Sequence, residues 1–146
     1  MPPDKLSDTL FGDVFLSHRF TDKHAEYEAC AGVWDRQVKV IIYSDPDTGE
    51  TNSAMSRARS IVEHFGQHKR ALLVHLDREF LPRFRENSGV VCSSDDLFGE
   101  LELQNITVHA DGRFSFGFAT CELLLHHALV VYFTSDSVIE NCDTPG

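Results

Sequence analysis

The sequence predicts an α+β fold in which an antiparallel β-sheet, built from two groups of strands, has two main helices packed on one face. Three observations lead to this prediction: three strand-like segments come first, two helical segments follow, and four further strand-like segments close the chain. Separate runs of strands and helices are typical of α+β proteins, whereas alternation is typical of α/β proteins. The chain of 146 residues has the length of one domain, which we expect at residues 10–143.

The N-terminal strands are predicted at residues 11–20, 26–31 and 37–43. Residues 1–9 are predicted to be a loose lead-in. The third strand has the clearest pattern, because Val38, Val40 and Ile42 stand at alternate positions and therefore share one face. A cluster of turn-forming residues at 44–49 ends the group.

The middle of the chain is predicted to be helical. The first helix begins at Asn52 or Ser53, whose side chains cap helices, and stops at Gly66. Its apolar stripe consists of Met55, Ala58, Ile61, Val62 and Phe65. The second helix is expected to bury Ala71, Leu72, Leu73, Leu76 and Phe80. It ends or kinks just before Pro82, because proline disrupts a helix interior. A short third helix opens at Ser93.

The last third of the chain is predicted to be a β-meander whose hairpin register follows from burial. A two-residue Asp-Gly turn would pair apolar with small or polar residues. A three-residue loop with Gly112 in the left-handed conformation pairs Val108 with Phe114 and Ile106 with Phe116. We predict the second register, because it gathers apolar side chains on one face. The glycine after Phe116 is expected to leave room for the close approach of another group.

The net charge of −10 is distributed unevenly. Residues 57–86 carry seven bases and four acids, whereas residues 87–146 carry one base, Arg113, and nine acids, which gives a net charge of −8. This balance argues against nucleic acid as a ligand, because binding to phosphates requires positive charge. It favours a basic protein partner.

We expect a cytoplasmic protein that does not contact membranes. No apolar run approaches the roughly 20 residues of a membrane span, and the N-terminus lacks the apolar region of a signal peptide. Cys30, Cys92, Cys121 and Cys142 form no CxxC pair, which is typical of buried or half-buried free thiols. No glycine-rich phosphate-binding loop is present in the sequence, and we predict no cofactor.

The order of several short motifs resembles a known family. In the N-terminal half these motifs are Tyr27-Glu-Ala, Gly32-Val-Trp34 and Val38-Lys-Val-Ile-Ile42. In the C-terminal half they are Asp96-Leu-Phe98, Leu101-Glu-Leu, Ile106-Thr-Val, Asp111-Gly112, Phe116 and His127-Ala-Leu-Val-Val131. Together they resemble the bacterial "domain of unknown function 2262" family, over most of the chain. The resemblance implies the fold and a bacterial origin, and it supplies no activity.

Two histidines of the first helical segment are candidate metal ligands. His64 and His68 stand at positions i and i+4, which could direct both rings from one helix to a common metal. The order Glu63-His64 differs from the HExxH zincin motif, in which the glutamate lies between the two histidines. If Gly66 ends the helix, the two histidines do not share one regular surface. We therefore predict no metal site and keep this pair as the candidates.

A second group of candidates lies in the break between Phe118 and Ala128, which separates two predicted strands of the meander. Cys121 and Glu122, with His126 or His127, could supply a nucleophile, an orienting carboxylate and a base. The surrounding sequence has neither a nucleophile elbow nor a papain-type cysteine motif. His127 is interpreted either as a histidine hydrogen-bonded at the rim of the sheet or as part of a pocket. The catalytic candidates are thus Cys121, Glu122 and His127.

The expected function is a non-catalytic protein-binding module. The acidic residues 87–146 would bind a basic protein partner, and an immunity protein that neutralises a basic toxin is one specific version. The alternative is a metal-dependent or Cys/His-based enzyme, or a small-molecule binder, with a site near His127. A homodimer is a further expectation, because the exposed edges of an open sheet tend to be paired or covered.

Overall fold

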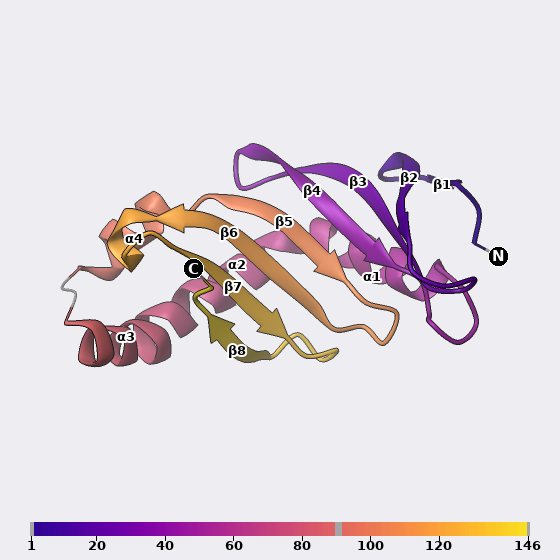
Figure 1. Cartoon of the computed structure of the whole chain (residues 1–146). Coiled ribbons are helices and arrows are strands. Elements are labelled where there is room, and N and C mark those ends of the chain that lie inside the picture. Colours follow the sequence, from indigo (N-terminus) through magenta and orange to yellow (C-terminus); the bar gives the residue numbers. More distant parts are fainter. Residues whose placement is uncertain (1, 90–91, 146) are drawn as a thin grey trace.

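The strands form one sheet, and their order across the sheet is their order in the chain (Figure 1). The computed structural model describes residues 2–89 and 92–145. The strands are β1 (Lys5–Asp8), β2 (Gly12–Arg19), β3 (Ala25–Val33), β4 (Arg36–Tyr43), β5 (Leu103–Val108), β6 (Phe114–Cys121), β7 (His127–Phe133) and β8 (Ile139–Asp143). The helices are α1 (Asn52–Glu63), α2 (Phe65–His75), the π-helical turn η1 (Leu76–Phe80), α3 (Leu81–Ser88), α4 (Ser94–Glu100) and the 3₁₀ turn η2 (Glu122–Leu124).

The centre of the sheet contradicts the prediction of an antiparallel arrangement. β4 and β5 run parallel, with Val40 opposite Ile106 and Ile42 opposite Val108. The other neighbouring strands are antiparallel. Parallel neighbours need a long crossover that returns the chain to the end where the first strand began, and the helices between β4 and β5 provide it. The molecule is therefore an α+β protein whose two strand groups merge into one mixed sheet.

The prediction of two main helices packed on one face is also wrong. Gly66, the predicted stop, lies inside α2, and the break between α1 and α2 falls at His64, whose ψ is 28°. The helical run also continues past Pro82, which lies in the first turn of α3, directly after η1. Proline is tolerated in the first turn of an α-helix, and the turn before it is π-helical here. The sheet dominates the fold, and a segmented helical run connects its two halves.

The first strand lies within the predicted lead-in. Residues 5–8 form β1 and pair with β2. The Asp8 carboxylate accepts hydrogen bonds from the N–H groups of Leu10 (2.9 Å) and Phe11 (3.1 Å), and it forms an ion pair with Arg59 of α1. Burial alone would raise the pKa of Asp8, but these donors outweigh it and lower the pKa. A strand this short shows too little alternation to be detected in the sequence.

The predicted register of the β5–β6 hairpin is confirmed. Val108 pairs with Phe114, Ile106 pairs with Phe116, and Gly112 has a φ of +93°. The four paired side chains are buried. The face that they share is the core of the molecule, and buried side chains of the helical run complete it: Ala54, Met55, Ala58, Ile61, Phe65, Leu72, Leu76 and Leu81.

Candidate functional site

The Cys/His/Glu candidates fall at the junction of β6, η2 and β7. Cys121 and His127 stand directly opposite each other across the two strands. Cys121 is buried, His127 is half-buried, and Glu122 is exposed in η2. The Nδ1 atom of His127 is buried and has no hydrogen-bond partner in the part of the chain that the structure describes. The structure thus brings Cys121 and His127 together but leaves Glu122 at the surface, so an orienting carboxylate is missing from this pair.

The two helical histidines lie in different environments. His64 is exposed at the break between α1 and α2, with Nδ1 3.0 Å from the Ser60 carbonyl oxygen. His68 is buried and packs edge-on against core aromatic rings: Phe114, Phe116 and Phe133. Burial, with the charges of Arg57 and His64, lowers the pKa of His68. Across residues 2–89 and 92–145, no three His, Cys, Asp or Glu side chains are grouped as metal ligands.

The acidic residues of the last part of the chain are exposed; seven of the nine are divided between the two ends of the sheet, and Glu140 and Asp143 lie on the edge strand β8. All nine acids of residues 87–146 are exposed. Asp111 and Asp136 lie in the turns after β5 and β7. Glu100, Glu102 and Glu122 lie at the other end, because they end α4, precede β5 and follow β6 (Figure 1). We call this second group, with the two acids in the first turn of α4, the acidic end: Asp95, Asp96, Glu100, Glu102 and Glu122.

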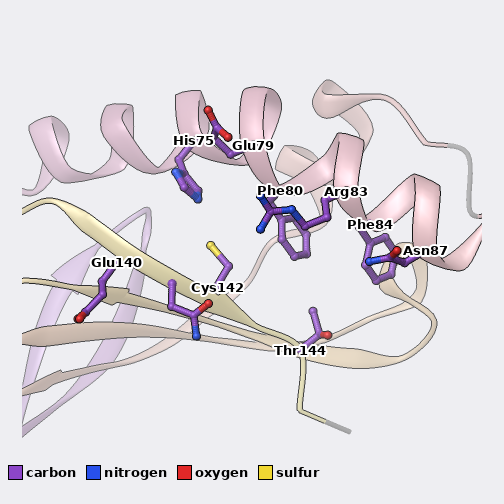
Figure 2. A pocket seen from close by; sticks show the side chains of 10 residues that line it. His75, Glu79, Phe80, Arg83, Phe84, Asn87, Glu140, Cys142 and Thr144 are labelled. Atoms are coloured by element: carbon purple, nitrogen blue, oxygen red, sulfur yellow. The ribbon is translucent and has the colours of Figure 1, made fainter.

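A polar cleft lies between β8 and the helical elements η1 and α3 (Figure 2). Its volume is about 510 Å³, which is within the range of roughly 300–1,000 Å³ that is typical of ligand pockets. Figure 2 shows Phe80, Arg83 and Phe84 on the helical side, and Cys142 and Thr144 on the strand side. The cleft therefore combines a sheet edge with aromatic and charged side chains of a helix.

The helical side of the cleft is shaped by the π-helical turn. Such a turn holds more residues than an α-helical turn and is frequent at functional sites. The π-helical turn that follows His75 holds one residue more than an α-helical turn, which brings Phe80 and Phe84 to the cleft. The two rings stack there, with their centroids 5.6 Å apart. The Arg85 guanidinium fixes α3 to the segment before α4 by donating two hydrogen bonds, of 3.1 and 2.5 Å, to the Cys92 carbonyl oxygen.

The chemistry of the cleft favours binding over covalent catalysis. Figure 2 shows the sulfur of Cys142 between β8 and the helices. Burial raises the pKa of the Cys142 thiol to about 11. The thiol is therefore protonated at neutral pH, whereas the thiolate is the nucleophilic form. Arg83 and Asn87 can donate hydrogen bonds, and Glu140 can accept them.

The sequence prediction missed this cleft because it placed an end or a kink of the second helix just before Pro82 and assigned no helical residues after it. Arg83, Phe84 and Asn87 were therefore not placed on a helical surface. One signal was available: Phe80 and Phe84 are four residues apart and would share a helix face only if the helix continued through the proline. The strand side could not be inferred, because no local pattern shows which strand ends the sheet.

Comparisons with known proteins do not identify the chain. No protein-family model matches it, and neither a curated protein nor a solved structure matches it. The resemblance to the domain of unknown function 2262 family therefore stays a prediction. No helix in the described residues is long and apolar enough to cross a membrane.

Proposed function

We propose that this chain is a non-catalytic protein-binding module that binds a basic partner protein through the acidic end. The observation that carries the proposal is the exposure of all nine acids in residues 87–146, a segment with a single base. The proposal includes a cytoplasmic setting in a bacterium, and an immunity protein against a basic toxin is its most specific form.

The charges of the acidic end are largely uncompensated within the chain. Glu102 is 2.7 Å from Arg36, as measured between Oε1 and Nη1. Asp95, Asp96, Glu100 and Glu122 have no ion pair in the residues that the structure describes. Exposed charges of one sign speed the association of an oppositely charged partner, and salt screens the effect. Binding at this end should therefore weaken as the salt concentration rises.

The alternative, a Cys/His-based site near His127, has one observation in its favour: Cys121 faces His127 across β6 and β7. The exposed position of Glu122 counts against it. Alkylation of the native protein tests the alternative, because an activated Cys121 would react faster than the same thiol in a His127→Gln variant. Equal rates would reject it.

The test of the proposal is a comparison of two triple charge reversals. The partner is captured on the immobilised chain, identified, purified and titrated at low and moderate salt. Glu100, Glu102 and Glu122 are changed together to lysine. The matched control changes Asp47, Glu50 and Asp136 to lysine, since these acids are exposed at the opposite end of the sheet and the net charge changes equally.

The proposal predicts that reversal at the acidic end weakens binding at least about tenfold, the effect of losing about 1.4 kcal/mol. The control reversal should change binding much less, and added salt should weaken binding of the native chain. Salt-insensitive binding, or equal effects of the two reversals, would overturn the proposal.

A further inference from the structure

We infer that the cleft beside β8 binds an extended segment of the partner protein, which adds to the sheet as a further strand. The inference rests on the proposed protein-binding function and specifies how the partner is held. β8 is the last strand in the order of the sheet, so one of its sides has no neighbouring strand in the described structure. A free strand edge pairs readily with an extended chain, because its outward N–H and C=O groups lack partners.

The pairing of β7 with β8 shows which backbone groups point outward. The N–H of Ala128 donates to the Pro145 carbonyl oxygen (3.1 Å), and two residues further along β7, Val130 stands opposite Asp143. Hydrogen-bonded and non-hydrogen-bonded pairs alternate along antiparallel strands, so Val130 and Asp143 form the next bonded pair. Tyr132 and Asn141 form the bonded pair after that, so Cys142 lies between the bonded positions Asp143 and Asn141. Its N–H and C=O therefore point away from β7, to the free edge.

The helical side of the cleft offers a surface to one face of the added strand. Phe80 and Phe84 are half-buried, and Figure 2 shows both rings directed toward β8, near Cys142 and Thr144. A chain lying beside β8 would cover these rings and gain the favourable free energy of apolar burial. Alternate side chains of a strand face the same side. The positions of the added strand that face the helices should therefore be apolar.

The negative charge of β8 favours basic residues on the face of the added strand that is directed away from the helices. Asp143 follows Cys142 in β8 and lies on the side of the sheet away from the cleft; it is exposed and forms no ion pair with any residue that the structure describes. Opposite charges on neighbouring strands stabilise pairing, and like charges oppose it. Lysine or arginine should therefore alternate with the apolar residues. A second copy of this chain fits less well, since two chains of net charge −10 would meet along acidic edges.

A defined peptide tests the inference without knowledge of the natural partner. The probe is a short fluorescent peptide in which valine and lysine alternate, titrated against the native chain by anisotropy. One control peptide has glutamate in place of lysine. Two further control peptides carry N-methyl groups on backbone nitrogens, one peptide along one edge and the other along the opposite edge. In the peptide whose methylated edge faces β8, that edge cannot donate hydrogen bonds to β8.

On the protein side, Cys142→Pro is compared with Cys142→Ala. Proline removes the outward N–H, whereas alanine keeps it, and edge strands tolerate proline where the N–H faces outward. Circular dichroism and the thermal midpoint verify that Cys142→Pro folds. The N-methylated peptides test the same hydrogen bonds on the unaltered protein, so the outcome does not depend on this variant.

The inference predicts that the valine–lysine peptide binds and that the glutamate peptide does not. Methylation of one edge, and Cys142→Pro relative to Cys142→Ala, should each weaken binding about three- to tenfold, as expected for a lost hydrogen bond. Amide NMR shifts should centre on Cys142 and Thr144.

The inference would be overturned by no binding of the valine–lysine peptide, by equal binding of all methylated forms, or by self-association of the chain with Cys142 cross-linking to its copy. The last result would assign the edge to a homodimer. The proposed function is judged separately: if reversal at the acidic end abolishes partner binding while Cys142→Pro leaves it unchanged, the function stands and strand addition is rejected.

Discussion

The guanidinium of Arg57 lies over the ring of Phe114, with Cζ 4.9 Å from the ring centroid. The same side chain donates hydrogen bonds from Nε to the Gly112 carbonyl oxygen (3.2 Å), and from Nη2 to the Ser135 carbonyl oxygen (2.9 Å) and the Ser137 hydroxyl (2.7 Å). One residue of α1 thus holds the turns that follow β5 and β7 against the core. These contacts fix two neighbouring hairpins at the same end of the sheet.

Replacing Arg57 by leucine should destabilise the protein by about 1–3 kcal/mol, because part-buried acceptors lose a charged donor. Urea unfolding measures the difference. Arg70→Leu is the control, since Arg70 is exposed on α2 and should tolerate the change within about 0.5 kcal/mol. An Arg57→Leu variant as stable as the control would show that the guanidinium does not hold the turns.

Gly117→Ala should destabilise the β5–β6 pair. A Cβ at this position would lie 2.6 Å from Oδ1 and 3.0 Å from Nδ2 of Asn105, which stands opposite on β5. Overpacking of this kind costs about 1–3 kcal/mol. Asn105→Ala removes the clashing atoms, so the double variant should recover most of the loss. Additive effects in this double-mutant cycle would contradict the contact.

Acid should destabilise the protein partly through His68. Burial lowers the pKa of His68 below its ordinary value, so the unfolded chain binds more protons than the folded protein as the pH falls below about 6.5. Stability contributed by the neutral imidazole is therefore present above that pH and is lost as the pH falls toward the folded pKa. The His68→Leu variant should show a shallower loss of unfolding free energy between neutral and mildly acidic pH. Equal slopes for the native chain and the His68→Leu variant would contradict this prediction.

The titration of Tyr43 should depend on Glu26. Burial first, then the hydrogen bond (2.9 Å) and charge of the Glu26 carboxylate, raise the pKa of Tyr43 to about 12. Glu26→Gln should lower this pKa toward the ordinary value of about 10 without reaching it, because the burial remains. NMR titration of the Tyr43 ring measures the pKa. Glu28→Gln, on the same strand, is the control, and an equal shift in both variants would exclude a specific role of Glu26.

The spacing of apolar residues and the positions of glycines determined the parts of this fold that depend on interactions between neighbouring residues. The β5–β6 register followed from burial, because a slip by one residue would have turned Ile106 and Phe116 away from the core. Gly112 marked the loop, since a left-handed φ strongly favours glycine. The glycine at position 117 marked a close approach, although the sequence did not show that the approaching group is Asn105.

The tertiary structure alone decided how these parts meet. The parallel pairing of β4 with β5 requires a crossover connection. The residues of these two strands do not indicate whether the neighbouring strand runs parallel or antiparallel. The π-helical turn before Pro82 let the helix continue, which created the cleft beside β8. The division of the acids between two ends of the sheet likewise depends on where the chain reverses. The spacing of apolar residues along a segment indicates which of its faces is buried. The strand order, the crossover and the cleft instead arise from contacts between segments that are far apart in the chain.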